Sequence, residues 1–425
     1  MSESGLNYIP VTRLRVGMFI ELELDWMSHP FSLNRFKIRS QSQIDTLTAI
    51  GVEKVLFDPS RSDASPLEVA EPSVQTVAAE AELLNIADKE ITKKVNLISK
   101  EEADAKALDL LEKKYTESCR IFKVLSKEAL SSPTNAKEKA EQLGSMLFEQ
   151  IQAEHIAIRL LADRTGEEFT LHNMNVAVLS TLLAKQMGLA DEQIKLVATA
   201  ALLHDIGKLS LPDRLRFHNM HLSSAEKNLL KEHVSKGVEM GKQMGLSHHI
   251  LLAIGQHHEL ADGSGYPLGI NVHRMTGEAK ILALINRYDN LCNTGVLTES
   301  LTPHEALRTI FATSRHEFDE GLLAAFVKLM GIYPPGSIVR LTDDRMAMVT
   351  SVNPKQPLRP VVLVYDEKAP RERAPMINLE DAPETSIRQA IKPGTLPKAI
   401  FDYLAPRRQL VYFIQKIESD DLSEA

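Results

Sequence analysis

The sequence has few of the features that mark secreted, membrane-embedded or nucleic-acid-coating proteins. Its 425 residues include two cysteines, Cys119 and Cys292, which excludes a disulfide framework and fits a reducing compartment. No apolar run approaches the roughly 20 residues that cross a bilayer, and no basic flank with an apolar core begins the chain. The net charge of −8 disfavours binding to a nucleic acid polymer or to a membrane surface. We therefore expect a cytoplasmic globular protein.

The composition changes along the chain and predicts a mainly α fold in five parts. These are a small α+β domain (1–60), a linker rich in proline and serine (61–75), a helical spacer (76–164), a helical domain (165–332), and a β appendage with a C-terminal tail (333–425). Within the spacer, the break near 132–135 predicts a second helix that runs from about 136 to 161. The apolar spacing of the spacer is irregular, so packing on its neighbour and a homodimer contact both stay open.

Start signals place several helices within the fourth part, the helical domain. Ser223 with Glu226, and Thr302 with Glu305, have the spacing of capping boxes. Asp191 is of a type that caps a helix, and we expect that helix to end near Gly207.

Metal-ligand side chains are concentrated in the helical domain. Nine of the 14 histidines lie between positions 172 and 258. Any one of them alone would more often be an ordinary core or surface residue, but adjacent His-Asp and His-His pairs together indicate a site. Imidazole and carboxylate without sulfur suit iron, manganese, nickel or zinc, and two such ions can clamp a phosphodiester. The candidate ligands and their neighbour are His204, Asp205, Lys208, His233, His257 and His258.

Two residues upstream extend this set. Glu168 precedes His172 by four positions, so on a helix both lie on one face, one turn apart. Glu168 either reaches the metal site or is a solvated acid in a first helical turn, where the helix dipole favours a negative charge.

These motifs resemble those of the HD-GYP family, a branch of the HD phosphohydrolases. HDIGK at 204–208 and HHELADGSGYP at 257–267 resemble the two signatures of that family, and the joint match is specific. KEHVSKG at 231–237 and HNMNV at 172–176 resemble its other histidine segments. The residues before this region resemble a small domain of unknown function that often precedes it, and YPPGSIVRL resembles the β extension that often follows it.

The resemblance implies two or three divalent ions (Fe, Mn, Ni or Zn) and assigns roles to individual residues. Asp205 would bridge two ions, Glu168 stands where some members have an extra carboxylate, and Lys208 would neutralise a phosphate oxygen. Gly265 and Tyr266 belong to a loop associated with the shape of the substrate site and with diguanylate cyclase (GGDEF) partners. The implied metal ligands are His172, His204, Asp205, His233, His257 and His258.

Two departures from the family pattern affect the expected site. Asn286 occupies the position of an aspartate ligand, which weakens one metal site, and Asp289 one turn later would compensate or orient a ligand. The segment TGVLTESLT at 294–302 lacks the arginine and tyrosine that many members carry. Arg287 or Arg315 could then contact the substrate, as could Asp289.

The activity implied by this resemblance is metal-dependent hydrolysis of cyclic di-GMP to linear pGpG and, in a second round, to GMP. Asn286 and the missing motif leave an alternative, a receptor that binds cyclic di-GMP without turnover. A phosphohydrolase acting on another cyclic dinucleotide is a third interpretation.

Overall fold

The structure is a computed structural model that describes residues 7–23, 31, 33–66, 106–161, 167–215, 222–294, 300–405 and 409–416. Its internal contacts divide the chain into two units, Met1–Glu102 and Ala103–Ala425, and each is taken by itself below. The predicted linker beyond 66 and the spacer up to 105 lie outside the described residues.

The first unit is a small α+β fold. Its antiparallel sheet has the order β1-β4-β2-β3, and helix α1 joins two of the strands. Ile20, Leu47 and Met18 are fully buried between the sheet and the helix, so this unit has a core of its own. The elements are β1 (Asn7–Pro10), β2 (Phe19–Glu21), β3 (Arg35–Lys37), α1 (Gln41–Ala49) and β4 (Lys54–Asp58).

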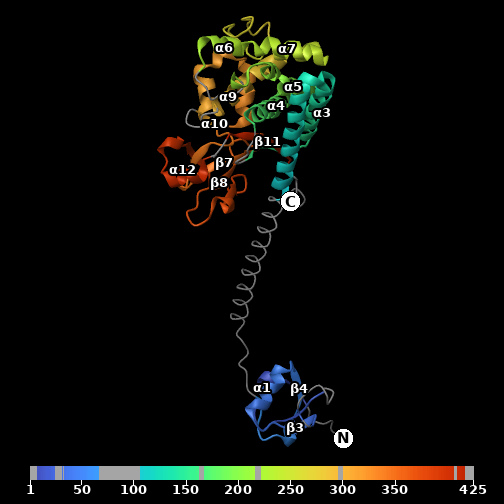
Figure 1. The fold of residues 1–425 in the computed structure, drawn as a ribbon. Helices are drawn as coiled ribbons and strands as arrows, with labels where there is room; N and C mark the ends of the chain where they lie inside the picture. Colours follow the sequence, from blue (N-terminus) through green and yellow to red (C-terminus); the bar gives the residue numbers. More distant parts are fainter. Residues whose placement is uncertain are drawn as a thin grey trace. The chain divides into compact units, whose positions relative to one another are not determined.

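The second unit is dominated by helices, most of which gather at one end of it, whereas α12 (Lys398–Leu404) lies beside the strands (Figure 1). A helical run at 106–131 leads into them. The helices that follow are α3 (Pro133–Ile151), α4 (Glu168–Gln186), α5 (Asp191–Leu203), α6 (Ser224–Lys231), α7 (His233–Met244), α8 (His248–Gln256), α9 (Gly277–Cys292), α10 (Pro303–Thr313), α11 (Glu320–Met330) and α12 (Lys398–Leu404).

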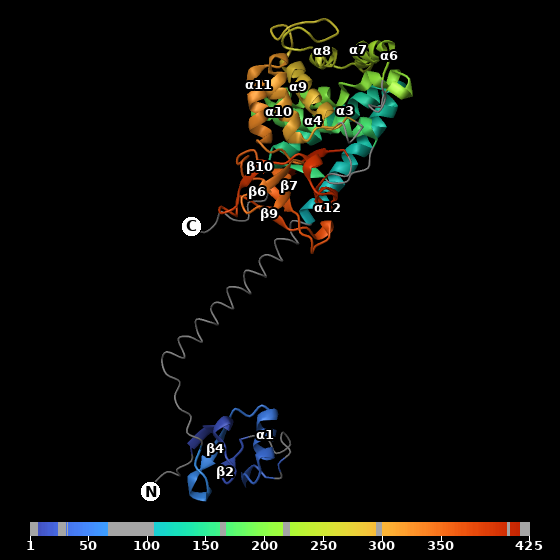
Figure 2. The same ribbon diagram turned by 90° about the vertical axis from the view of Figure 1, so that its left-hand side faces the viewer.

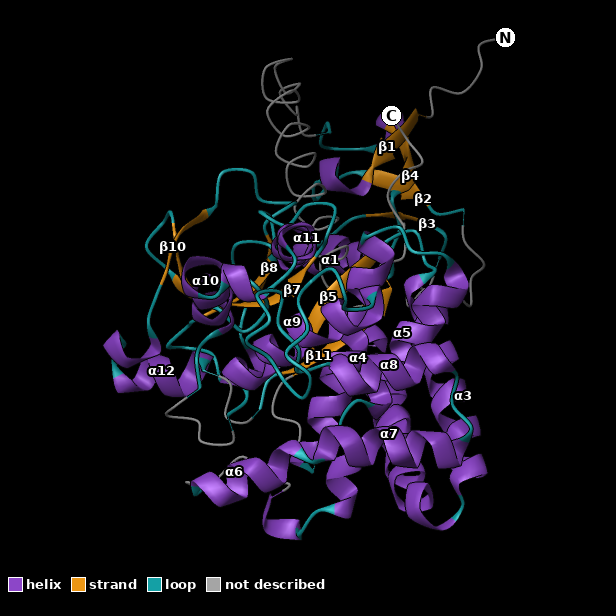
Figure 3. Ribbon diagram, turned by 90° about the horizontal axis from the view of Figure 1, so that it is seen from above, coloured by secondary structure: helices purple, strands orange, loops and turns teal. Residues whose placement is uncertain are grey.

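Helix α4 is the centre of this bundle. Its residues from Phe169 to Ala184 are all buried, including polar ones such as Asn173 and Asn175. The helix packs against α5, α9, α11 and the strand β11, and Figure 3 shows α5 beside it. A helix that is buried on every side, as α4 is, lies at the centre of its bundle.

The strands of the second unit form one seven-stranded sheet at the other end of the unit (Figure 2). Along its main path the order is β10-β6-β7-β5-β11, with β8 and β9 extending from β7. The sheet therefore joins a strand that precedes the helical domain to the last described strand of the chain. Its members are β5 (Ile156–Leu161), β6 (Ile338–Leu341), β7 (Met346–Val352), β8 (Val361–Val364), β9 (Met376–Asn378), β10 (Ile387–Ala390) and β11 (Val411–Lys416).

The predicted fold class, mainly α with a small α+β region before the bundle and strands after it, is confirmed, and two local predictions are wrong. The expected helix from 136 to 161 ends at Ile151, and 156–161 form strand β5, because these apolar residues pair with β11 along its whole length. Asp191 is the first residue of α5 and Ala190 precedes it as the cap; α5 ends at Leu203, four residues before the expected Gly207.

The predicted capping boxes at Ser223 and Thr302 are both present. Among the described residues, no helix combines the length and the apolar character that a membrane crossing needs.

A close backbone contact fixes the short 3-10 helix η3 (Ile206–Ser210) against α7. A Cβ atom on Gly207 would collide with the carbonyl oxygen of His233 and with the backbone nitrogen of Gly237. Only glycine permits this approach, which brings the residues before η3 and the first residue of α7 together.

We predict that Gly207→Ala lowers the free energy of unfolding by about 1–3 kcal/mol, the usual cost of overpacking, because the backbone atoms it meets cannot rotate away. Gly277→Ala is the matched control: nothing lies within 4 Å of its added methyl group, and the change should be neutral or stabilising by up to about 1 kcal/mol. Urea denaturation followed by circular dichroism measures both. Equal stability of Gly207→Ala and the wild type would contradict the packing argument.

Candidate metal centre

Three histidines of the motifs lie at helix boundaries, where the side chain of each forms a hydrogen bond with a backbone carbonyl at the end of a helix. His204 follows α5, His233 begins α7, and His257 follows α8. In each case Nδ1 lies within hydrogen-bond distance of the carbonyl oxygen three residues earlier, which can only accept. Nδ1 therefore carries the proton, and Nε2 of the neutral ring keeps a free lone pair. The pairs are His204 with Ala201 (2.7 Å), His233 with Leu230 (2.6 Å) and His257 with Ile254 (2.7 Å).

His172 has the same ring orientation through a different partner. It lies on α4, and its Nδ1 is 2.7 Å from Oδ2 of the buried Asp289. A carboxylate oxygen is a hydrogen-bond acceptor, so Nδ1 of His172 donates and its Nε2 points into the cluster. A carboxylate behind a histidine is the arrangement that commonly orients metal ligands.

The Nε2 atoms of the four histidines face one another in two pairs. Nε2 of His172 is 3.2 Å from Nε2 of His204, and Nε2 of His233 is 3.2 Å from Nε2 of His257. In the second pair both rings carry their proton on Nδ1, and two lone pairs at this distance repel each other unless a cation lies between them. Two ligands held at about 2.1 Å from one ion stand about 3.0–3.4 Å apart for bond angles between 90° and the tetrahedral angle. The observed spacing fits that range.

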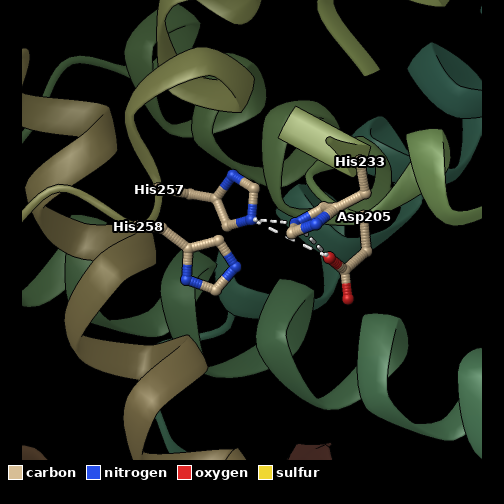
Figure 4. Close-up of side chains that lie close together, drawn as sticks. All are labelled: Asp205, His233, His257 and His258. Atoms are coloured by element: carbon tan, nitrogen blue, oxygen red, sulfur yellow. Dashed lines mark hydrogen bonds and ion pairs between the residues drawn. The ribbon is translucent and has the colours of Figure 1, made fainter. Parts of the chain in front are cut away.

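Asp205 lies between the two pairs and offers one oxygen to each. Its Oδ2 is 3.5 Å from Nε2 of His172 and 3.6 Å from Nε2 of His204. Its Oδ1 is 3.3 Å from Nε2 of His233 and 3.8 Å from Nε2 of His257. Figure 4 shows Asp205 beside these two rings. Oδ1 is buried with no hydrogen-bond donor among the described residues. A carboxylate placed in this way can bridge two cations.

The electrostatics of the cluster favour neutral imidazoles beside an ionised carboxylate. Burial lowers the pKa of His204 to about 4 and also lowers the pKa values of His233, His257 and His258. Burial alone would raise the pKa of Asp205, but the nearby Lys208 ammonium and the imidazoles bring it well below its usual value. At neutral pH these groups are therefore ready to bind a metal.

His258 completes the second pair and connects it to the signature loop. With His233, His257 and Asp205 it forms a group whose ligand atoms lie within 4.8 Å of one another (Figure 4). Its ring stacks on Tyr266 with centroids 4.6 Å apart. Gly265 permits this, because a Cβ there would meet the backbone from His258 to Leu260.

Lys208, Glu168 and Arg287 have different relations to the cluster. Lys208 is buried, with its Nζ 2.6 Å from Oδ2 of Asp205. Glu168 is the first residue of α4, and among the described residues it belongs to neither group of close ligand atoms. Arg287 is exposed on α9.

The two residues of the divergent segment on α9 are both buried. Asn286 accepts a hydrogen bond from Asn290 (2.8 Å). Asp289 is fully buried and accepts from His172, Asn175 and Asn293. The predicted substrate contact for Asp289 stays a prediction. The alternative that it orients a ligand is the one that its contacts match.

Sequence reasoning missed three residues that support the site. Glu259 is fully buried and accepts from the backbone nitrogens of Leu268 (2.6 Å) and Ile270 (3.0 Å), which fixes the loop around Tyr266. Asn175 and Asn293 hold Asp289. The signal for Asn175 was a polar residue three positions after His172, close to the same helix face; the sequence offers none for Asn293.

Comparison with protein families agrees with the motifs. Residues 155–322 match the HD domain, 6–140 match a domain of unknown function (DUF3391), and 338–399 match the KOW domain associated with the HD domain. The resemblance inferred from the sequence, an HD domain behind a small N-terminal domain, is confirmed. The chain carries an HD domain, whose fold is that of metal-dependent phosphohydrolases.

Individual relatives cover different shares of the chain. A cyclic di-GMP phosphodiesterase of Pseudomonas aeruginosa is 28% identical over 364 residues, 85% of each chain. The 3'3'-cGAMP-specific phosphodiesterase 1 of Vibrio cholerae is 30% identical over 158 residues, 37% of this chain and 36% of that enzyme. The solved structure of an HDG"Y"P protein from Bdellovibrio bacteriovorus aligns with a TM-score of 0.40 at 16% identity, covering 76% of this chain and 98% of that one.

We predict that the metal-free protein loses stability as the pH falls from about 6.5 towards 4. The unfolded histidines take up protons near their ordinary pKa of 6.5, whereas the buried ones do so only at lower pH. The unfolded state therefore binds more protons in this window, and each such histidine contributes about 1.4 kcal/mol per pH unit. Asp205 acts in the same direction, but only below its ordinary value of 3.8.

Urea titrations in the presence of a chelator, repeated across this pH range, measure the effect. His204→Gln removes one of these histidines and should reduce the slope of the unfolding free energy against pH by the contribution of about one proton. A free energy of unfolding that stays constant between pH 6.5 and 5 would contradict the burial of neutral imidazoles.

Proposed function

We propose that this HD-domain protein is a metal-dependent phosphodiesterase that hydrolyses cyclic di-GMP to pGpG and further to GMP. The observation that carries the proposal is the pair of facing imidazole sets around Asp205, each with two Nε2 atoms 3.2 Å apart. The relative that spans 85% of the chain is a cyclic di-GMP phosphodiesterase, which supports this choice of substrate.

Two groups of side chains would hold the ions. His172 and His204 form one set, and His233, His257 and His258 form the other, with Asp205 common to both. Bound divalent ions would act as Lewis acids on the phosphate and lower the pKa of a water molecule. Iron, manganese, nickel and zinc all suit this donor set, which contains nitrogen and oxygen and no sulfur.

The protein's own groups would orient the substrate and balance its charge. Lys208 lies beside Asp205 at the cluster, and its ammonium can stabilise the negative charge that develops on a phosphate oxygen. Tyr266 stacks on His258 and offers an aromatic face beside the ligands, with Lys231 5.0 Å from its ring centre. Arg287 stays a candidate substrate contact, and Glu168 a candidate ligand for a third ion.

Two alternatives each rest on one observation. Asn286 is neutral and its oxygen already accepts from Asn290, so it contributes less to a third metal site than an aspartate would, and this favours two ions or a weakly catalytic receptor. Relatives from Vibrio cholerae that are specific for 3'3'-cGAMP favour a different cyclic dinucleotide. Diguanylate cyclase partners, a homodimer and a cytoplasmic location stay predictions.

We predict that the protein loaded with Mn²⁺ or Fe²⁺ cleaves cyclic di-GMP, and that His204→Ala and Asp205→Ala each reduce kcat by more than about 100-fold, the scale of losing one electrostatic stabiliser of a transition state. His249→Ala is the matched control, because that side chain is 66% exposed and outside both groups of ligands. Chromatography of the products under anaerobic conditions measures the rates. Full activity in both cluster variants would refute the assignment.

We predict a kcat/KM at least about tenfold higher for cyclic di-GMP than for 3'3'-cGAMP, a difference of about 1.4 kcal/mol in the transition state. Parallel assays at equal metal loading compare the two substrates. The reverse order would favour the second alternative, and nucleotide binding without product under every metal would favour the receptor.

A further inference from the structure

The last described strand of the chain packs against α4, the helix that carries His172. Strand β11 pairs with β5 over six residues, from Val411 with Leu161 to Lys416 with Ile156. Its side chains Val411, Tyr412 and Phe413 are fully buried. This strand lies beyond both the matched HD domain, which ends at 322, and the matched KOW domain, which ends at 399.

Two asparagines connect the backbone beside this strand to the buried carboxylate of Asp289. Asn175 on α4 donates to Oδ1 of Asp289 (2.8 Å) and to the carbonyl oxygen of Leu410 (2.7 Å). Asn293 at the end of α9 donates to the same two oxygens, at 2.9 and 3.1 Å. The two amides therefore approach one carboxylate oxygen and one backbone carbonyl from two different helices.

The backbone returns a hydrogen bond to each amide. The nitrogen of Tyr412 donates to Oδ1 of Asn175 (3.0 Å), and the nitrogen of Leu410 donates to Oδ1 of Asn293 (2.8 Å). These bonds fix which end of each amide faces the carboxylate, because the oxygen must face the backbone N–H group. Asn175 is fully buried and Asn293 is 8% exposed, so water does not readily replace these partners.

We propose that the segment 410–412 positions the first metal ligand, through Asn175 and Asn293, which hold Asp289, which in turn holds His172. The other oxygen of Asp289, Oδ2, accepts from Nδ1 of His172 and so directs its Nε2 towards His204 and Asp205. The inference rests on the proposed metal-binding function of His172. Asn175 and Asn293 are positioning residues, since they act through Asp289 and not on the substrate.

These contacts affect only one of the two sets of metal ligands, the set that contains His172. The set made of His233, His257 and His258 is oriented by backbone carbonyls of α6 and α8 and by Tyr266, not by Asp289. Loss of the hydrogen bonds at 410–412 should therefore weaken binding of the ion beside His172 and leave binding of the other ion unchanged. A general loss of stability would weaken binding of both ions.

The test measures Mn²⁺ binding to the full chain by equilibrium dialysis and metal analysis, with folding checked by circular dichroism. Wild type should bind two ions. Asn293→Ala and Asn175→Ala should each raise the dissociation constant of one ion by about 10–100-fold, as removal of an orienting partner usually does, and leave the other unchanged. Tyr412→Phe is the matched control: it removes contacts of the same strand with Tyr288 and Pro335 but none with Asp289.

A double-mutant cycle assigns the affected pocket. In a His172→Ala background, Asn293→Ala should have no further effect on the remaining ion, whereas in a His233→Ala background it should have its full effect. If Asn293→Ala does not fold, Asn293→Ser, which keeps a small hydrogen-bonding group, is measured in its place.

The outcomes separate the two proposals. A wild-type protein that binds no Mn²⁺ overturns the proposed metal centre and the inference with it. Two ions in the wild type, with both affinities unchanged or equally weakened in the asparagine variants, overturn the positioning role alone.

Discussion

The structure around Asp205 depends on one electrostatic constraint: four imidazole Nε2 atoms point towards each other in the interior. Backbone carbonyls hold the protons of His204, His233 and His257 on Nδ1, which leaves the Nε2 of each of these three neutral rings with a lone pair inside the cluster, and Asp289 holds the fourth ring, His172, in the same orientation. Such an arrangement is unfavourable by itself, and burial disfavours the protonation that would relieve it. Bound cations would remove this repulsion, so the folded chain holds the side chains in an arrangement suited to metal binding.

Helix ends place these groups, and the rest of the fold holds the ends together. A histidine that terminates a helix uses one nitrogen to satisfy a terminal carbonyl, which orients the other nitrogen without any additional residue. Gly207 allows the backbone carrying Asp205 to approach α7. Glu259 fixes the loop beside the second pocket, and the segment at 410–412 fixes Asp289 behind the first. Residues about 240 positions apart in the sequence therefore share one site.

The ligand-type residues could be predicted from the sequence because adjacent His-Asp and His-His pairs are unusual and short helices bring them together. The role of Asp289 could not be decided, since its partners Asn175 and Leu410 become neighbours only when β11 packs against α4 and α9. The same distant pairing explains the wrong helix at 156–161: an apolar run of this length suits a helix or a strand, and the partner strand lies 250 positions away. The two capping boxes were predictable because they are entirely local.

Anomalous X-ray diffraction from a crystal of the Mn²⁺-loaded protein tests the central claim most directly. Two peaks are predicted, one between His172 and His204 and one between His233 and His257, each within bonding distance of a different oxygen of Asp205. Peaks away from Asp205, or an empty cluster at saturating metal, would contradict the account, because the facing nitrogens would then need some other explanation.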